Sequence, residues 1–206
     1  MKHVPNTLTA GRIVAAPVAL YLLWSGTVWG QTAGTALFIV AAITDYFDGH
    51  LARRHGTVSR LGQFMDPLAD KVLVLGGFGL VPFLDPIGRG LTEPAGPWLP
   101  WAAIGAIAAR DVAVTVLRAL YERRGVSLQT STAAKWKTAW QLTFLISAFV
   151  FLSGTHLQGS GGALGALGGA LESVLLSPGP LVFLVVTAAV TVYTGWLYFR
   201  PAPATT

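Results

Sequence analysis

The sequence contains no cysteine among its 206 residues, so disulfide bonds and thiolate metal sites are excluded. Charged side chains are also scarce, because they make up 11% of the chain, whereas an average soluble domain has about 25%. Hydrophobic residues make up 53%, and a soluble chain of this length could not bury so much apolar surface. The composition therefore indicates a membrane protein.

Long runs almost free of charge alternate with short polar segments. Most runs approach the roughly 20 residues that a helix needs to cross a bilayer. We expect an all-α, polytopic integral membrane protein with a single domain, residues 1–206, and about six transmembrane helices. Residues 1–8 are predicted to form an interfacial segment, and residues 201–206 a disordered tail. The predicted helices are 9–26, 33–55, 60–83, 98–122, 134–153 and 180–199.

Several segments between and within these helices have signatures of their own. Residues 9–26 are expected to be a retained helix, since no convincing cleavage site for a signal peptide follows them. The Pro- and Gly-rich residues 82–97 are expected to form an outer loop. Residues 159–173 are so rich in glycine that we expect a flexible outer linker with an amphipathic piece. The seven tryptophans mostly fall near predicted helix ends, as interfacial anchors do.

Basic residues are distributed unevenly along this pattern. With six spans and a cytoplasmic N-terminus, all 14 Lys and Arg residues except Arg89 fall on the cytoplasmic side. The positive-inside rule then places both termini in the cytoplasm and the protein in the cytoplasmic (inner) membrane. The formal net charge of +5 is interpreted as this bias, together with attraction to anionic lipid, and not as a nucleic-acid surface.

Four aspartates are concentrated in one stretch, TDYFDGHLARRHGTVSRLGQFMDPLAD, residues 44–70. Asp45 and Asp48 are three positions apart, and Asp66 and Asp70 are four apart, so each pair lies on one face of its helix. The tight connection between the two helices makes them antiparallel neighbours. Both pairs are therefore expected to converge at the cytoplasmic end.

Four carboxylates gathered at a membrane face repel one another unless cations neutralise them. Oxygen ligands without cysteine favour Mg²⁺ or Mn²⁺ over Zn²⁺. A set of four suits a two-metal site, in which the ions clamp phosphate oxygens during a displacement reaction. We therefore expect a site with two divalent ions.

Small residues lie among the aspartates, and they leave room for a ligand to approach the backbone. Gly49, Ala52 and Gly62 supply this space, and Arg53 lies one turn beyond Gly49, where it can contact a phosphate or a base edge. The combination predicts a site for a nucleotide diphosphate.

Two other interpretations of the aspartates fit the sequence less well. A single aspartate could be a membrane-edge carboxylate paired with a nearby basic residue such as Arg53, Arg54, Arg60 or Lys71, but four with interleaved glycines fit that description poorly. A cation transporter would have acidic residues near mid-membrane on several helices, and many transporters are built from repeated halves. Here the aspartates lie at one face and no internal repeat is found.

The pattern Asp45-x2-Asp48-Gly49-x2-Ala52-Arg53-x8-Gly62-x3-Asp66-x3-Asp70 resembles, at every fixed position, the signature of the CDP-alcohol phosphotransferase superfamily. That resemblance implies a six-helix fold, usually in a homodimer. It also implies that Asp45, Asp48 and Asp66 are the core metal ligands. Asp70 would be the general base and a further metal ligand. Donor-binding residues would be Asp48, Gly49, Ala52, Arg53 and Gly62.

Other stretches bear on the identity of the alcohol that accepts the transferred group in this family. Residues 4–18 resemble the opening of bacterial phosphatidylglycerophosphate synthases and of the related cardiolipin synthases. Residues 109–126, 133–141 and 195–200 resemble the former more closely. Asp111 departs from this pattern, since glutamate usually follows Ala-Arg in the synthases, and aspartate there also occurs in the cardiolipin synthase pattern.

A basic cluster supports the same interpretation, because an acceptor that carries a phosphate needs cationic partners. It consists of Arg110, Arg118, Lys135 and Lys137, at the cytoplasmic ends of the fourth and fifth predicted helices. The resemblance thus implies transfer of a phosphatidyl group from CDP-diacylglycerol to glycerol 3-phosphate, with release of CMP. Phosphatidylglycerol or inositol phosphate as acceptor remains the alternative.

Overall fold

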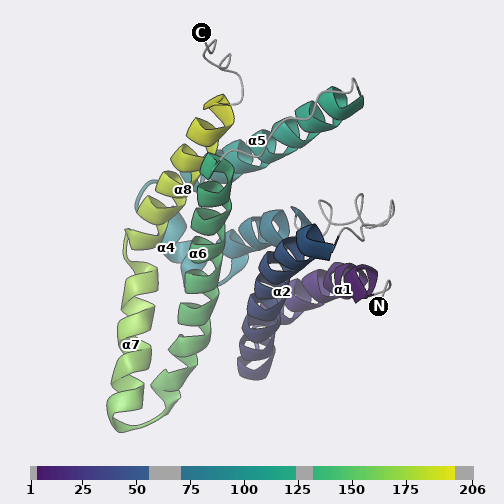
Figure 1. Ribbon diagram of the computed structural model, residues 1–206. Helices are drawn as coiled ribbons and strands as arrows, with labels where there is room; N and C mark the ends of the chain where they lie inside the picture. The colour runs from purple at the N-terminus through teal and green to yellow at the C-terminus, as the bar shows by residue number, and fades with distance from the viewer. Residues whose placement is uncertain (1–3, 56–70, 124–131, 198–206) are drawn as a thin grey trace.

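The computed structural model describes residues 4–55, 71–123 and 132–197, and the side chains within 11–44, 71–121 and 136–197. Regular structure in these ranges is entirely helical (Figure 1). Residues 71–80 form a helix that continues into η1. The other elements are α1 (Val4–Trp24), α2 (Val28–His55), η1 (Val81–Phe83), α4 (Ile87–Thr92), α5 (Trp98–Arg123), α6 (Thr132–Thr155), η2 (His156–Gly159), α7 (Gly162–Leu176) and α8 (Gly179–Trp196).

The all-α prediction is confirmed, and five of the six predicted helices correspond to α1, α2, α5, α6 and α8. Two described helical stretches, Trp136–Gly159 and Gly179–Trp196, are long and apolar enough to cross a membrane. Shorter apolar helices occur at Gly11–Trp24, Val28–Thr44, Lys71–Phe83 and Gly162–Leu176. A count of six spans, the interfacial role of residues 1–8 and the single-domain boundaries stay predictions. The predicted tail, 201–206, lies outside the described residues.

The first two helices begin earlier than the sequence predicts. α1 starts at Val4. α2 starts at Val28 because Thr27 caps it: the backbone N–H of Gly30 donates to Thr27 Oγ1 at 3.0 Å. Gly26, with φ of 67°, makes the turn between the helices.

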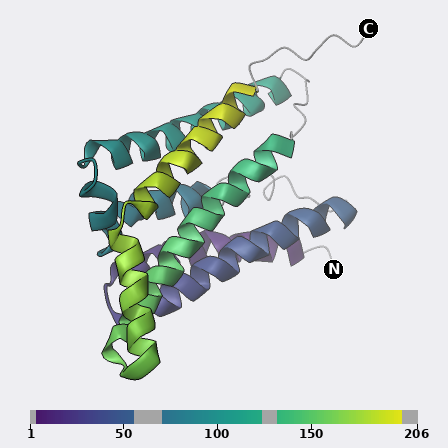
Figure 2. The same ribbon diagram turned by 90° about the vertical axis from the view of Figure 1, so that its left-hand side faces the viewer.

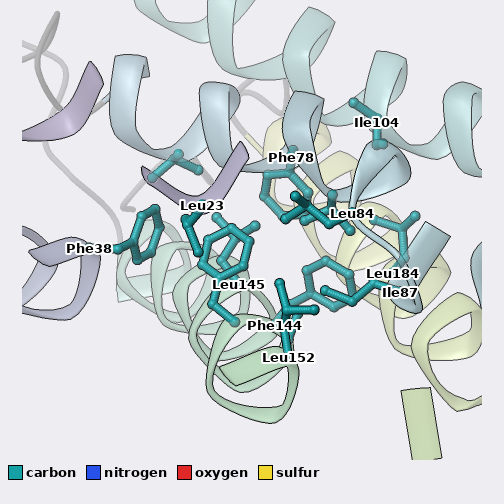
Figure 3. Close-up of a cluster of buried hydrophobic side chains, with 14 of the residues drawn as sticks. Leu23, Phe38, Phe78, Leu84, Ile87, Ile104, Phe144, Leu145, Leu152 and Leu184 are labelled. Carbon is teal, nitrogen blue, oxygen red and sulfur yellow. The ribbon is translucent and has the colours of Figure 1, made fainter. Parts of the chain in front are cut away.

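Helix packing builds a continuous apolar core. α1 packs on α2, α2 on α6, and α8 on both α5 and α6. Phe38, Phe78 and Phe144 are among the largest fully buried side chains, and Figure 3 shows them between the helices. The rings of Phe78 and Phe144 stack with centroids 5.5 Å apart. This core packs the 71–80 helix against α6 and so fixes the positions of the helices that carry the polar residues.

The prediction of a flexible linker at 159–173 is wrong. This stretch contributes most of α7, which packs on α6, η2 and α8. A Cβ atom on Gly165 would lie 2.2 Å from the carbonyl oxygen of Ser160, and one on Gly168 would lie 2.5 Å from the backbone nitrogen of Gln158. Glycine is therefore used here for close helix packing and not for flexibility.

The predicted outer loop at 82–97 is also more ordered than expected. It contains part of η1 and the short helix α4, in which Ile87 and Leu91 are fully buried. These two side chains anchor the segment to the core, and a composition rich in proline and glycine does not reveal such anchors. Gly96, with φ of 74°, then leads the chain into α5.

Most tryptophans lie near helix ends, as the sequence predicts, and their role as interfacial anchors stays a prediction. Each of the seven is at least 38% exposed. Trp24 ends α1, Trp29 and Trp98 open α2 and α5, and Trp196 ends α8. Exposed indole rings at helix ends are typical of the membrane–water interface.

The long helices run between two ends of the bundle (Figure 2). At one end α2, α5 and α8 finish and α6 begins, and we call it the polar end. At the other, α1 finishes and α2 and α5 begin, and we call it the opposite end. Helix α2 thus carries its last turns to the same end as the C-terminal half of α5 and the first turns of α6.

Candidate active site

The aspartate signature begins on α2. Asp45 and Asp48 lie in its C-terminal part, and the helix continues without a break to His55. An unbroken helix places residues three apart on neighbouring positions of one face. Gly49, Ala52 and Arg53 belong to the same helix, as the sequence predicts, although their side chains and those of Asp45 and Asp48 lie outside the described set.

Gly62, Asp66 and Asp70 lie outside the described residues. Convergence of the four aspartates therefore stays a prediction. Among the described side chains, no group of three or more His, Asp and Glu residues is placed to hold a metal ion. The signature still fits a hard divalent cation, because the four residues predicted to be metal ligands are all aspartates, which offer carboxylate oxygens.

Three charged side chains meet in the interior near the polar end. The Lys137 ammonium on α6 donates to both carboxylate oxygens of Asp111 on α5, at 2.9 Å and 2.7 Å. Arg110 Nη1 donates to Asp111 Oδ1 at 3.2 Å. The exposed fractions of the Arg110, Asp111 and Lys137 side chains are 10%, 8% and 11%. We call these three residues the Asp111 cluster; their formal charges sum to one positive charge.

Helix α8 completes the surroundings of this cluster. Gln141 Nε2, from a side chain that is 1% exposed, lies 3.3 Å from Asp111 Oδ2 and 3.3 Å from Thr191 Oγ1. Arg110 Nη2 reaches Thr194 Oγ1 at 3.4 Å. A Cβ atom on Gly195 would lie 2.7 Å from Arg110 Cγ, so glycine leaves the space in which that side chain runs.

The predicted basic residues thus separate into two groups. Arg110 and Lys137 are brought together on one carboxylate by α5 and α6. Arg118 lies two turns beyond Arg110 on α5 and is half-buried. Lys135 belongs to the first turns of α6, and its side chain is outside the described set. Binding of an anion by any of the four stays a prediction.

Sequence reasoning missed Gln141, Thr191 and Thr194 as parts of this site. Two signals were present. Gln141 is a polar residue followed by a long apolar run in α6, and Thr187, Thr191 and Thr194 share one face of α8 by their spacing. All three threonines are buried, and two of them, Thr191 and Thr194, meet polar groups of α6 and α5.

A cavity of about 320 Å³ lies at the opposite end. Its lining includes Trp24, Gln31, Asp85 and His156. The His156 ring and the Gln31 side chain are hydrogen-bonded at 2.7 Å, Nε2 to Oε1. The lining residues lie around the ends of α1, η1 and α6 and at the start of α2, whereas Asp45 and Asp48 lie in the C-terminal part of α2.

The chain matches the family model described as CDP-alcohol phosphatidyltransferase over residues 2–196. It is 33% identical to the CDP-diacylglycerol–glycerol-3-phosphate 3-phosphatidyltransferase of Cereibacter sphaeroides, over 97% of this chain and 95% of that protein.

Two plant proteins are also similar. A CDP-diacylglycerol–glycerol-3-phosphate 3-phosphatidyltransferase of Arabidopsis thaliana is 37% identical over 69% of this chain, which spans 49% of that longer protein. A CMP-forming cardiolipin synthase of Oryza sativa is 33% identical, over 69% of this chain and 44% of the rice protein. The match to the family model covers both the aspartate signature and the Asp111 cluster, and this chain belongs to the CDP-alcohol phosphatidyltransferase family.

Proposed function

We propose that this enzyme transfers the phosphatidyl group of CDP-diacylglycerol to glycerol 3-phosphate and releases phosphatidylglycerophosphate and CMP. The observation that carries the acceptor assignment is the near full-length similarity to the bacterial 3-phosphatidyltransferase. The Asp111 cluster supports it, because a buried group of two cations and one anion favours a ligand with negative charge.

The donor site is assigned to the aspartate signature. Asp45, Asp48, Asp66 and Asp70 would hold two divalent ions, Mg²⁺ or Mn²⁺, which would neutralise phosphate charge. Asp48, Gly49, Ala52, Arg53 and Gly62 would line the slot for the cytidine diphosphate part of the donor. The place of Asp45 and Asp48 on one continuous helix supports this assignment.

The reaction is a direct displacement. Asp70 takes the proton of the primary hydroxyl of glycerol 3-phosphate, and the resulting oxygen attacks the β-phosphorus of the donor. The bond from that phosphorus to the oxygen bridging to CMP breaks, and CMP leaves with the electron pair. Positioning and electrostatic stabilisation supply most of the acceleration in phosphoryl transfers of this kind.

The acceptor phosphate is assigned to Arg110, Arg118, Lys135 and Lys137. Charge-assisted hydrogen bonds from Arg and Lys are the strongest that a protein offers to a phosphate. Arg110 and Lys137 are held within one buried cluster, so they would present their charges from fixed positions. This arrangement favours a small anionic acceptor.

A second acceptor is supported by one comparison. The similarity to a cardiolipin synthase indicates that phosphatidylglycerol is a candidate acceptor for the same chemistry. Inositol phosphate is a further candidate because it is also anionic. Substrate comparison separates all three.

The test is release of radiolabelled CMP from CDP-diacylglycerol in detergent micelles with Mg²⁺ or Mn²⁺. Glycerol 3-phosphate, phosphatidylglycerol and inositol phosphate are offered singly, with Asp70→Asn as the inactive control. Release with glycerol 3-phosphate alone is expected. Release only with another acceptor would overturn the acceptor assignment and leave the donor chemistry standing.

We also propose that the protein is a homodimer in the cytoplasmic membrane, with both termini and the polar end on the cytoplasmic side. The absence of cysteine allows a direct test with single-cysteine variants. Glu93→Cys, at the opposite end, should react with a membrane-impermeant maleimide on intact cells. Tyr121→Cys, in the last turn of α5, should react only after permeabilisation. The reverse result would invert the topology.

A further inference from the structure

We propose that Asp111 is a positioning residue for the acceptor phosphate: its carboxylate fixes the Lys137 ammonium and the Arg110 guanidinium in place. This inference rests on the proposed function. It concerns a negatively charged side chain inside a site that must attract an anion, and such a group needs an explanation.

The first step is the contact between Asp111 and Lys137. Both carboxylate oxygens accept from the ammonium, at 2.9 Å and 2.7 Å. A lysine side chain has a flexible four-carbon stem, and its charge has no fixed place unless a partner holds it. Asp111 therefore restricts where Lys137 presents its charge.

The second step is the anchoring of Asp111 itself. Gln141 links Asp111 Oδ2 to Thr191 on α8, and both of these neighbours are at most 1% exposed. Arg110 bonds Asp111 through Nη1 and Thr194 through Nη2. The carboxylate is thus held directly by Arg110 on α5 and by Lys137 and Gln141 on α6, and two of these partners, Arg110 and Gln141, are in turn bonded to threonines on α8.

The third step is the charge. Two cations buried beside each other repel, and a neighbouring carboxylate reduces that cost. One carboxylate between two cations still leaves the cluster with one net positive charge. Asp111 therefore stabilises the two cations side by side before the acceptor arrives.

The alternative is that this ion pair only holds α5 against α6. In that case loss of Asp111 lowers stability and the amount of active enzyme, while the KM for glycerol 3-phosphate stays unchanged. A positioning role makes the opposite prediction: the KM for glycerol 3-phosphate rises, and the KM for CDP-diacylglycerol does not.

The experiment measures both KM values, kcat and the thermal unfolding midpoint in detergent for wild type, Asp111→Asn and Asp111→Glu. For Asp111→Asn we expect the KM for glycerol 3-phosphate to rise about 10- to 100-fold, the scale on which small misplacements of binding groups act. The KM for CDP-diacylglycerol should stay within about twofold. Asp111→Glu restores the charge and should recover most of the loss.

A double-variant cycle shows whether Asp111 acts through Lys137. Lys137→Met should raise the KM for glycerol 3-phosphate, and adding Asp111→Asn to it should have little further effect. The matched control is Asp85→Asn, which makes the same chemical change in the exposed ion pair at the opposite end and should leave every value unchanged.

Gln141→Leu keeps all three charges and removes one donor to Asp111, so it carries the test if Asp111→Asn fails to fold. Its KM for glycerol 3-phosphate should rise about threefold, as loss of one hydrogen bond predicts. An unchanged KM in the folded Asp111 or Gln141 variants would overturn this inference alone. A wild-type enzyme that releases no CMP with glycerol 3-phosphate would overturn the proposed function and this inference together.

Discussion

The two ends of the bundle each contain a carboxylate bonded to a basic side chain, in very different surroundings. Near the polar end, Lys137 Nζ lies 2.7 Å from Asp111 Oδ2, and the side chains are 11% and 8% exposed. At the opposite end, Arg89 Nε lies 2.5 Å from Asp85 Oδ1, and the side chains are 50% and 68% exposed. Because the distances are alike, burial and surroundings separate the two pairs.

Exposure to solvent determines how strongly the two charges of each pair interact. The hydrogen bond that Arg89 donates to Asp85 raises the pKa of its guanidinium above the ordinary value. A raised pKa of a base favours its charged form, which Arg already has at any physiological pH. This pair therefore provides no pH response in that range, and water screens its attraction.

The Asp111 cluster has a different consequence. Its charges are mostly shielded from water and are bonded to buried Gln141. Removal of one partner leaves another charge buried, which is costly. Buried charges are expected where a protein binds a charged ligand. We therefore interpret the Asp111 cluster near the polar end as part of a binding site for an anion.

The largest expected difference between the ends is catalytic. Asp70→Asn should lower kcat for CMP release by about 10²- to 10⁴-fold, the usual contribution of a general base. Removal of divalent metal with EDTA should abolish activity, and added Mg²⁺ or Mn²⁺ should restore it. Asp85→Asn, measured in parallel, should keep wild-type activity. Full activity in Asp70→Asn would remove the proposed base from the mechanism.

The second prediction concerns stability. Asp111→Asn should lower the free energy of unfolding by about 3–5 kcal/mol, the typical cost of breaking a buried ion pair. Denaturant or thermal unfolding in detergent measures this change. Asp111→Asn combined with Lys137→Met should recover part of it, because no unpaired ammonium then stays buried beside the asparagine. A single variant as stable as wild type would show that water reaches the cluster.

The sequence could predict the helices because each is a long apolar run with polar ends. The prediction succeeded for α5 and α6 to within about two residues, the usual precision of helix ends. It placed α2 five residues late, at 33 and not Val28, because the capping hydroxyl of Thr27 was not recognised. The prediction failed for α7 because glycine lowers helix propensity. In the folded protein, close packing against η2 leaves no room for larger side chains and so favours glycine at these positions.

The candidate site was less predictable from the sequence than the helices were. The metal-binding role of the aspartates, predicted from their spacing, and the anion-binding role of Arg110 and Lys137, predicted from their charge, both stay predictions. The sequence did not reveal that Asp111 would join these two residues, because the contact depends on how α5 and α6 are placed against α8. Side-chain pairs 26 residues apart, as Asp111 and Lys137 are, become visible only in three dimensions.

A smaller effect is expected on α8. Thr191→Val removes the hydroxyl that meets Gln141 and should lower the free energy of unfolding by about 1 kcal/mol. Thr187→Val is the matched control, because Thr187 is equally buried but donates to the carbonyl oxygen of Phe183 in its own helix. Thermal unfolding of the two variants compares them directly. Equal losses would show that the bond between α6 and α8 adds nothing.

The smallest effect is expected at the exposed pair. Asp85→Asn removes the charge that faces Arg89, but both side chains stay in contact with water. Solvent hydrates the guanidinium in the variant as well as in the unfolded chain, so the unfolding midpoint should not change measurably. Unfolding at low and high salt provides the check, since any remaining attraction would be screened as salt increases. A clear loss of stability at low salt that disappears at high salt would show that Asp85 and Arg89 hold α4 in place. The contrast with Asp111 would then be one of degree, and burial alone would no longer explain it.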